Sequence, residues 1–241
     1  MNSNFIIEAQ NLKKIYGQGE AKTFALNGVS FKVKQGEFLS IMGPSGCGKS
    51  TLMHIIGFLD YPTSGTYKFE GKSPNELTDS EISEIRNKKI GFIFQFFNLL
   101  PRTTVLENVK LPLVYTKLSN KEKQKRALQA LEAVGMSHRL KFYPNQLSGG
   151  EQQRVAIARA IVNQPKVILA DEPTGNLDSK SGQKVMEILQ KLNEQGQTII
   201  LVTHEKYTSE MAERIIYLKD GRIIGEERVH QRKFAKDGLV K

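Results

Sequence analysis

The chain has 241 residues, of which 39% are hydrophobic and 25% are charged, and its net charge is +10. This length suits one large domain or two small ones and can bury a sizeable core. No apolar run reaches about 18 residues, which excludes a membrane-spanning helix. A single cysteine, Cys47, excludes a disulfide framework and a cysteine-rich zinc site. The first residues lack the layout of a secretory signal, so we expect a cytoplasmic protein.

The positive charge raises the possibility of a nucleic-acid or anionic-membrane partner. Lysine and arginine are scattered, however, and the heaviest basic run, residues 117–126, is interrupted by Glu122. Solvated surface charge and local attraction for a nucleotide explain such a distribution equally well. We therefore expect no nucleic acid among the partners.

The predicted elements alternate between strands and helices, which favours an α/β fold with a largely parallel sheet. Four apolar runs predict buried strands, at residues 37–43, 89–95, 166–172 and 197–203. A shorter antiparallel strand is predicted at 65–71. Near the end, residues 214–226 predict a hairpin in which Asp220 and Gly221 form the two-residue turn.

Two helices have clear sequence signals. After Asp178, apolar residues recur at helical spacing, and Gly196 suits the end of that helix. Ser119 and Glu122 form a capping-box pattern before a second helix, which contains Ala127, Leu131 and Val134. About seventy residues without a strand signal separate strands 89–95 and 166–172, which is too long for a loop. We interpret residues 96–163 as an inserted helical subdomain.

The segment GPSGCGKST lies between a predicted strand and a predicted helix, the context that a P-loop requires. Its residues are Gly43, Pro44, Ser45, Gly46, Cys47, Gly48, Lys49, Ser50 and Thr51. The glycines let successive N–H groups surround phosphate oxygens. Lys49 would bridge the β- and γ-phosphates and Ser50 would ligate Mg²⁺. We interpret Cys47 as a small filler residue rather than a redox group.

Two acids end the strand in VILADEP, at the sheet edge where α/β folds bind ligands. Asp171 would hold Mg²⁺ and Glu172 would polarise the attacking water. Adjacent residues of an extended strand point to opposite faces, so the two carboxylates can have different roles. The alternative is an acidic strand end that only caps the following turn.

Two further residues end strands at the same predicted edge. His204 follows strand 197–203 and could reach a γ-phosphate, although an isolated histidine after a strand is usually a surface residue. Gln95 ends strand 89–95 and could touch Mg²⁺ or water through its neutral amide. Position beside the P-loop and the two acids raises both above the other histidines and glutamines.

Five motifs occur in this chain in the order and spacing of ATP-binding cassette (ABC) ATPases: the P-loop, QFFNLLP, LSGGEQQR, ILADEPTGNLDS and VTH. The chain resembles that family from Phe5 to about Glu227. The resemblance implies a P-loop NTPase (RecA-like) core with Walker A and Walker B motifs, an antiparallel β subdomain and an inserted α-helical subdomain. It implies one domain, with the core at 1–95 and 164–227, the helical subdomain at 96–163 and a C-terminal tail at 228–241. The tail could fold, bind the permease or be disordered; its mixed charge and few apolar residues make disorder the default expectation.

In that family two domains pack head to tail, so the resemblance implies an ATP-dependent homodimer. The signature residues Ser148, Gly149, Gly150 and Glu151 would then close over the nucleotide that the other chain's P-loop holds. ATP and Mg²⁺ are the implied cofactors, and with every catalytic position filled, ATP hydrolysis coupled to transport is the implied activity.

The resemblance assigns other residues as well. Tyr16 matches the aromatic that stacks on adenine, with a half-buried strand-end tyrosine as the alternative, and Asp178 matches a loop that contacts the partner's P-loop. Gln95 matches the hinge between core and helical subdomain. The apolar residues after it, which are Phe96, Phe97, Leu99 and Leu100, suit either a groove for a permease or the subdomain core.

Within the family, the chain most resembles the branch for lipoprotein release and macrolide or antimicrobial-peptide export (LolD/MacB-like). The residues that carry this resemblance are GFLDYPTSG, the segment after QFFNLLP, and Gly175-Asn176. The partner implied is an integral membrane permease, which would hold this chain on the inner face of the cell membrane. Alternatives are an importer ATPase, a cell-division complex, and a non-transport ABC ATPase acting on DNA or ribosomes.

Overall fold

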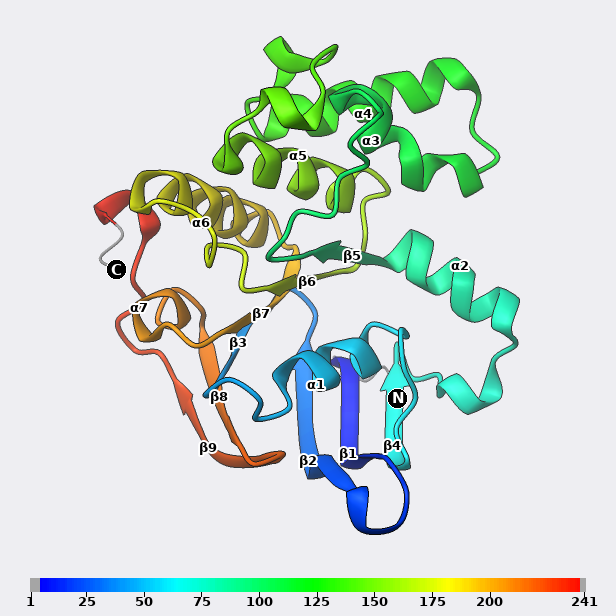
Figure 1. Cartoon of the computed structure of the whole chain (residues 1–241), viewed down its shortest axis with the longest axis vertical. Coiled ribbons are helices and arrows are strands. Elements are labelled where there is room, and N and C mark those ends of the chain that lie inside the picture. Colours follow the sequence, from blue (N-terminus) through cyan, green and yellow to red (C-terminus); the bar gives the residue numbers. More distant parts are fainter. Residues whose placement is uncertain (1–4, 239–241) are drawn as a thin grey trace.

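The computed structural model describes residues 5–238 and contains two sheets (Figure 1). The smaller sheet is antiparallel, with strand order β2-β1-β4. Its strands are β1 (Phe5–Tyr16), β2 (Thr23–Lys34) and β4 (Ser64–Phe69). The predicted strand at 65–71 is β4. The bounds of β1 and β2 could not be predicted, because register shifts in their pairing interrupt the alternation of polar and apolar residues.

The larger sheet has the strand order β5-β6-β7-β3-β8-β9. Its strands are β3 (Phe38–Met42), β5 (Ile90–Ile93), β6 (Val167–Asp171), β7 (Thr198–Thr203), β8 (Arg214–Lys219) and β9 (Arg222–Arg228). All neighbouring pairs are parallel except β8 and β9. Asp220 and Gly221 have φ values of 49° and 70°, as a tight hairpin turn requires. The predicted mostly parallel core and the terminal hairpin are confirmed.

Helix α1 (Lys49–Ile56) packs between the two sheets (Figure 1). Its apolar side chains, which are Leu52, Met53, Ile55 and Ile56, are buried in the same hydrophobic cluster as residues of both sheets. Burial of this apolar surface holds the small sheet on the core and fixes the loop that precedes α1.

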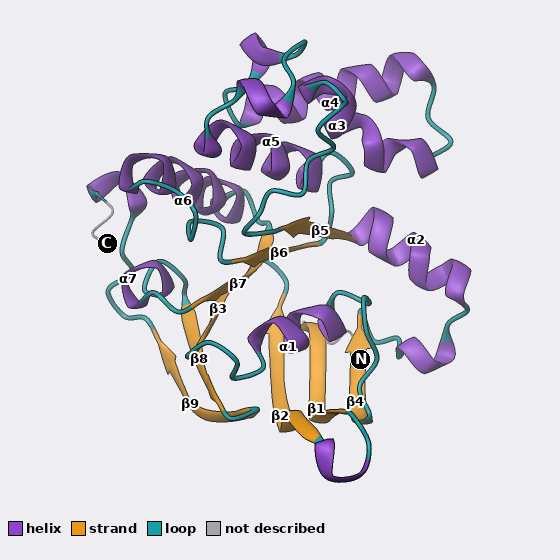
Figure 2. Cartoon of the chain, in the orientation of Figure 1, coloured by secondary structure: helices purple, strands orange, loops and turns teal. Residues whose placement is uncertain are grey.

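Helix α2 (Asp79–Lys89) precedes β5 in the chain. Three helices follow β5, which are α3 (Val105–Lys110), α4 (Asn120–Ala133) and α5 (Gly149–Ile161). The last three form a layer above the sheet, and α5 contacts β5, α3, α4 and α6 (Figure 2). Ser119 caps α4 by accepting the Glu122 N–H at 3.2 Å, but the reciprocal half of the predicted capping box is not formed. Short 3₁₀ turns complete this region, at Pro74–Glu76, Leu111–Tyr115, Ser137–Arg139 and Pro144–Gln146.

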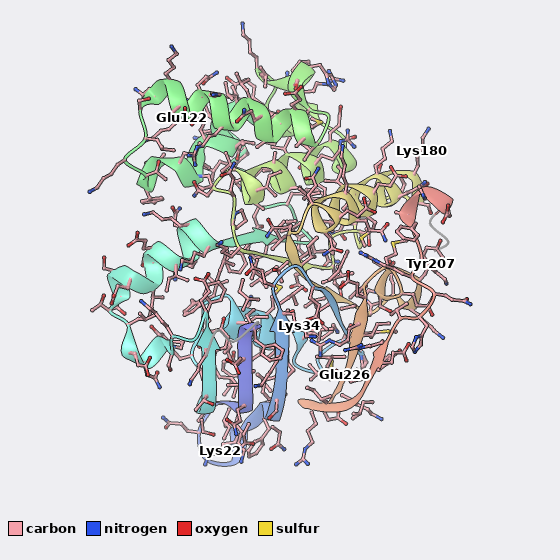
Figure 3. The ribbon with its side chains drawn as sticks, turned by 180° about the vertical axis from the view of Figure 1, so that it is seen from behind. Lys22, Lys34, Glu122, Lys180, Tyr207 and Glu226 are labelled. Atoms are coloured by element: carbon pink, nitrogen blue, oxygen red, sulfur yellow. The ribbon has the colours of Figure 1, made fainter. Side chains whose placement is uncertain are left out.

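The C-terminal segment packs against α6 (Ser179–Glu194) and α7 (Lys206–Ser209), so the expectation of disorder is wrong for residues 229–238. The buried Gln190 amide accepts from Ala235 N and donates to Lys233 O, both at 2.8 Å. Ala235, in a 3₁₀ turn at Ala235–Asp237, is fully buried. Figure 3 shows Tyr207 and Lys180 on this side of the molecule. Composition missed this segment because its hydrogen bonds, ion pairs and cation–π contacts join residues that are distant in the sequence. Residues 239–241 lie outside the described range.

No helix within residues 5–238 is both long enough and apolar enough to cross a membrane.

Candidate nucleotide-binding site

The loop between β3 and α1 has the geometry of an anion site. Gly46 and Gly48 have φ values of 77° and 104°, a region that other residues rarely adopt. A Cβ on Gly48 would lie 2.2 Å from Ala25 O of β2, so the close approach of that strand's backbone also requires glycine at position 48. The loop leads directly into the first turn of α1, whose unpaired N–H groups favour negative charge.

The predicted phosphate-binding lysine lies inside this loop. Lys49 is 6% exposed, and its Nζ donates to Gly43 O at 2.8 Å and to Pro44 O at 2.7 Å. Phosphate oxygens can replace these two neutral acceptors with charged ones. Cys47 is buried, and its Sγ would lie 2.7 Å from a Cβ on Gly43, which agrees with the role of a small filler.

Asp171 and Ser50 come together beside this loop. The Ser50 hydroxyl donates to Asp171 Oδ2 at 3.2 Å, although 121 residues separate them in the sequence. Burial raises the pKa of the Asp171 carboxyl; the hydrogen bond from Ser50 lowers it in part, and the negative charge of Glu172 raises it further. A carboxylate beside a hydroxyl at a phosphate site is the protein ligand set that Mg²⁺ takes.

Glu172 has an unusual backbone conformation. Its φ is 43°, in the left-handed region, and β6 ends at Asp171. The sequence argument that the two acids alternate along one extended strand is therefore wrong, because the chain turns at Glu172 instead. The turn is held by hydrogen bonds from Glu172 N to Val202 O at 2.9 Å and from Gly175 N to Glu172 O at 3.0 Å.

The turn brings Glu172 to His204. Glu172 Oε1 lies 2.9 Å from His204 Nδ1, and the two side chains are 18% and 50% exposed. A carboxylate that accepts from one ring nitrogen leaves the other nitrogen available for a ligand. Two residues predicted separately from the ends of β6 and β7 are thus direct neighbours.

Gln95 faces the segment after Glu172. Its Nε2 lies 3.5 Å from Asn176 Oδ1, and Asn176 Nδ2 donates to Gln95 O at 3.1 Å. A Cβ on Gly175 would lie 2.8 Å from Gln95 Nε2, so a larger residue here would displace the end of the Gln95 side chain. In the described structure no hydrogen bond joins the Gln95 side chain to Ser50 or Asp171, and contact with Mg²⁺ stays a prediction.

Tyr16 is 42% exposed at the end of β1. Its hydroxyl donates to Asp60 Oδ2 at 2.9 Å, and Lys14 Nζ lies 5.0 Å from its ring centre. Partial burial and the Asp60 carboxylate raise the pKa of the Tyr16 phenol. Stacking of this partly exposed ring on adenine stays a prediction. Sequence reasoning missed Asp60, which has no local motif of its own.

The signature residues form the start of α5, in the helical layer, whereas the P-loop lies between β3 and α1, at the sheet edge where β6 ends (Figure 1). Ser148 and Glu151 make a full capping box, with Ser148 N donating to Glu151 Oε2 at 2.9 Å and Glu151 N donating to Ser148 Oγ at 3.3 Å. These bonds lower the pKa of Glu151, which also pairs with Arg139 at 3.3 Å. Asp178 caps α6 by accepting from Ser181 N at 2.9 Å.

The apolar residues after Gln95 divide into two pairs. Phe97 and Leu99 pack against the core, whereas Phe96 is 73% exposed and Leu100 is 46% exposed. The subdomain-core interpretation holds for Phe97 and Leu99. Contact of Phe96 and Leu100 with a permease stays a prediction.

Together these features define a P-loop ATPase: a glycine loop that opens a helix, a lysine inside that loop, and two side-chain pairs at one sheet edge. One pair joins a hydroxyl to a carboxylate, and the other joins a carboxylate to a histidine. A family model described as "ABC transporter" matches residues 26–175. The chain belongs to the ABC transporter family, binds ATP and hydrolyses it. The resemblance found in the motifs is confirmed.

Similar proteins cover almost the whole chain. An ABC transporter ATP-binding protein of Methanocaldococcus jannaschii is 54% identical over 219 residues, which is 91% of this chain and 98% of that protein. The macrolide export ATP-binding/permease protein MacB of Aggregatibacter actinomycetemcomitans is 50% identical over 95% of this chain but only 36% of its own length.

Solved structures agree. The dimeric ABC transporter cassette MJ0796 is 51% identical and superimposes with a TM-score of 0.86, covering 93% of this chain and 99% of that one. A dimeric post-hydrolysis state of the same cassette, bound to ADP and Pi, has a TM-score of 0.85 at 50% identity, with the same coverage.

Proposed function

We propose that two copies of this chain close head to tail on two ATP molecules. The observation that carries this proposal is that the signature turn lies in a different layer from the chain's own P-loop, although both are helix starts suited to phosphate. A second copy supplies the missing half of each site. The dimeric relative MJ0796 supports this arrangement.

The geometry and the family resemblance support the following roles. The P-loop N–H groups and Lys49 hold the β- and γ-phosphates, and Tyr16 stacks on the adenine. Glu172 orients the attacking water by accepting a hydrogen bond from it. His204 donates a hydrogen bond to the γ-phosphate from its second ring nitrogen. Ser148 and the N–H groups of Gly149 and Gly150 complete the site from the partner chain, with Asp178 and Glu151 at the same contact.

Ser50, Asp171 and Gln95 are the proposed protein ligands of Mg²⁺. Only one carboxylate is required because phosphates and water supply the other oxygens, and within residues 5–238 no group of three or more acidic, histidine or cysteine side chains could hold a metal on its own. Bound there, Mg²⁺ would neutralise charge developing on the phosphates.

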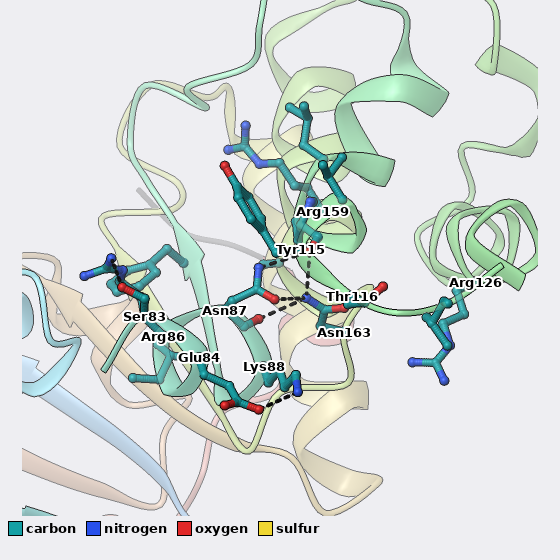
Figure 4. A pocket seen from close by; sticks show the side chains of 18 of the residues that line it. Ser83, Glu84, Arg86, Asn87, Lys88, Tyr115, Thr116, Arg126, Arg159 and Asn163 are labelled. Atoms are coloured by element: carbon teal, nitrogen blue, oxygen red, sulfur yellow. Dashed lines mark hydrogen bonds and ion pairs between the residues drawn. The ribbon is translucent and has the colours of Figure 1, made fainter. Parts of the chain in front are cut away.

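We infer that a membrane permease is the second partner, since the MacB relatives join an ATP-binding part to a permease part. A groove of about 1510 Å³ between α2 and the helical layer suits it (Figure 4). Val114 and Tyr115 line it and are 63% and 81% exposed. Asn87 and Asn163 also line it, and Asn163 Nδ2 donates to Asn87 O at 3.0 Å and to Asn87 Oδ1 at 3.3 Å.

The groove is basic. Arg86, Lys117 and Arg159 line it, and none of them contacts a carboxylate within residues 5–238. Glu84, the acid in the lining, is paired with Lys88 at 2.5 Å. A permease segment with an apolar face and at least one carboxylate would complement these charges. Movement of the helical subdomain, 96–163, about Gln95 would then transmit dimer closure to the permease.

The branch that the motifs favour is export, lipoprotein release or peptide and drug efflux, with the chain held on the cytoplasmic face of the membrane. The test is a pulldown with a tagged Glu172→Gln chain and ATP from detergent-solubilised membranes of the source organism. Capture of a permease with few spans and a large extracytoplasmic domain supports the branch. Capture of a compact multi-span importer subunit contradicts the branch, and capture of DNA or ribosomes alone contradicts the transporter partner.

A further inference from the structure

Gln153 lies in α5, three residues after Gly150, and its side chain is fully buried. Its Nε2 donates to Pro173 O at 2.9 Å and to Phe94 O at 3.3 Å. Pro173 directly follows Glu172, and Phe94 directly precedes Gln95. One side-chain amide therefore holds two peptide segments, each adjacent to a residue of the nucleotide site.

The orientation of this amide is fixed. Turning it over would point Oε1 at two carbonyl oxygens, which cannot donate. In the present orientation Oε1 is buried and has no hydrogen-bond partner among the described residues. A buried acceptor without a partner is unfavourable, and an apolar side chain of similar volume would avoid that cost. Packing alone therefore does not explain why an amide stands here.

The segment that the amide holds is the turn at Glu172. Since Glu172 has a φ of 43°, its conformation persists only where surrounding contacts determine it. The bond from Glu172 N to Val202 O holds the turn from the side of the sheet, and the bond from Gly175 N to Glu172 O closes the turn on itself. The bond from Gln153 to Pro173 O holds it from the side of α5, the helix that Ser148 begins.

We propose that Gln153 is a positioning residue that connects the signature helix to the turn carrying Glu172. Contact of Ser148 with the partner's nucleotide displaces α5 as a rigid helix, and the Gln153 amide transmits that displacement to Glu172 and to the hinge at Gln95. The occupied state of one nucleotide site thereby sets the position of the acid at the other. This inference rests on the ATP-closed dimer proposed above.

The test compares Gln153→Leu with Gln152→Leu in the full-length chain. Gln152 is the matched control, because it is the adjacent glutamine and, among the described residues, its Nε2 donates only to Leu147 O, at 3.2 Å. For Gln153→Leu we expect kcat to fall about ten- to a hundredfold, as small misplacement of a catalytic group does. The nucleotide Kd should stay within about twofold of wild type, and Gln152→Leu should change neither by more than that.

Two further measurements separate positioning from simple loss of structure. Combined with Glu172→Gln, Gln153→Leu should still give an ATP-dependent dimer, because the proposal concerns the acid and not the closure. If Gln153→Leu does not fold, Gln153→Asn, whose shorter amide cannot reach both carbonyls, takes its place. Equal kcat for the Gln153 and Gln152 variants overturns the proposal, as does a kcat loss matched by an equal loss of nucleotide affinity. Failure of Glu172→Gln alone to dimerise contradicts the dimer instead.

Discussion

His204 Nδ1 lies 2.9 Å from Glu172 Oε1, across the ends of two neighbouring parallel strands. This contact couples the orientation of the acid to the residue proposed to bond the γ-phosphate. We predict that His204→Ala lowers kcat by about 10²- to 10³-fold, as loss of one charge-stabilising donor does. Nucleotide binding should persist, because the P-loop and Lys49 are untouched.

Steady-state ATP hydrolysis and equilibrium binding of a fluorescent nucleotide measure the two effects. His138→Ala is the control, since His138 is exposed in a 3₁₀ turn of the helical layer. Equal turnover in the two histidine variants would contradict the assigned role of His204.

Asp171 should reduce the stability of the nucleotide-free chain. Burial raises its pKa above the unfolded value, so the folded state binds the proton more tightly. The contribution of this group to the free energy of unfolding is therefore most favourable below its unfolded pKa of about 3.9 and is lost as pH rises through the higher folded value.

At pH 7, Asp171→Asn is then predicted to raise Tm without nucleotide while abolishing hydrolysis, and the gain in Tm should shrink in acid. Thermal unfolding at several pH values measures this. Asp220→Asn is the control, because asparagine also tolerates the left-handed turn position. A Tm for Asp171→Asn at or below that of wild type at pH 7 would contradict the prediction.

The two signature glycines should differ in their tolerance of a side chain. A Cβ on Gly150 would lie 2.6 Å from Ser181 Oγ on α6, whereas the nearest atom to a Cβ on Gly149 is Leu177 Cδ2 at 3.5 Å. Gly150→Ala should cost about 1–3 kcal/mol through overpacking, and each 1 kcal/mol lowers Tm by about 2–4 °C in a chain of this size. Gly149→Ala should leave Tm unchanged or higher. Equal values would mean that α5 and α6 can separate freely.

The C-terminal segment depends on Gln190. Replacing it with leucine leaves Ala235 N and Lys233 O without their partners, which costs about 1–3 kcal/mol. We predict a lower Tm and faster tryptic cleavage after Arg228 and Arg232. Gln183→Leu, on the same helix, is the control, because within residues 5–238 its amide bonds only the nearby Glu187. Unchanged proteolysis in Gln190→Leu would show that other contacts suffice.

The sequence predicted elements with strong local signals. The four apolar strands and the Asp220-Gly221 hairpin are present because continuous apolar runs and turn residues act locally. β1 and β2 had no bounds, since their register shifts break the period of two. Helix α2 was also missed, although Thr78 and Glu81 form a capping box that could have indicated its start.

The candidate site was predicted residue by residue but not its contacts. The order of the motifs predicted that the P-loop, Asp171, Glu172 and His204 meet at one sheet edge. The contacts of Asp171 with the P-loop and of Glu172 with His204 confirm this. The turn at Glu172 and the Gln153 amide could not be predicted, because each depends on hydrogen bonds between segments far apart in the sequence. Composition likewise misjudged the tail, whose buried contacts lie on α6.

The central claim, that ATP closes two chains on each other, is tested most directly by light scattering of Glu172→Gln with and without ATP and Mg²⁺. The account predicts a monomer mass without nucleotide and twice that mass with it, since binding is retained and hydrolysis is blocked. The same variant carrying Lys49→Ala should stay monomeric in both conditions. A monomer with ATP in the single variant, at concentrations that saturate nucleotide binding, would contradict the account.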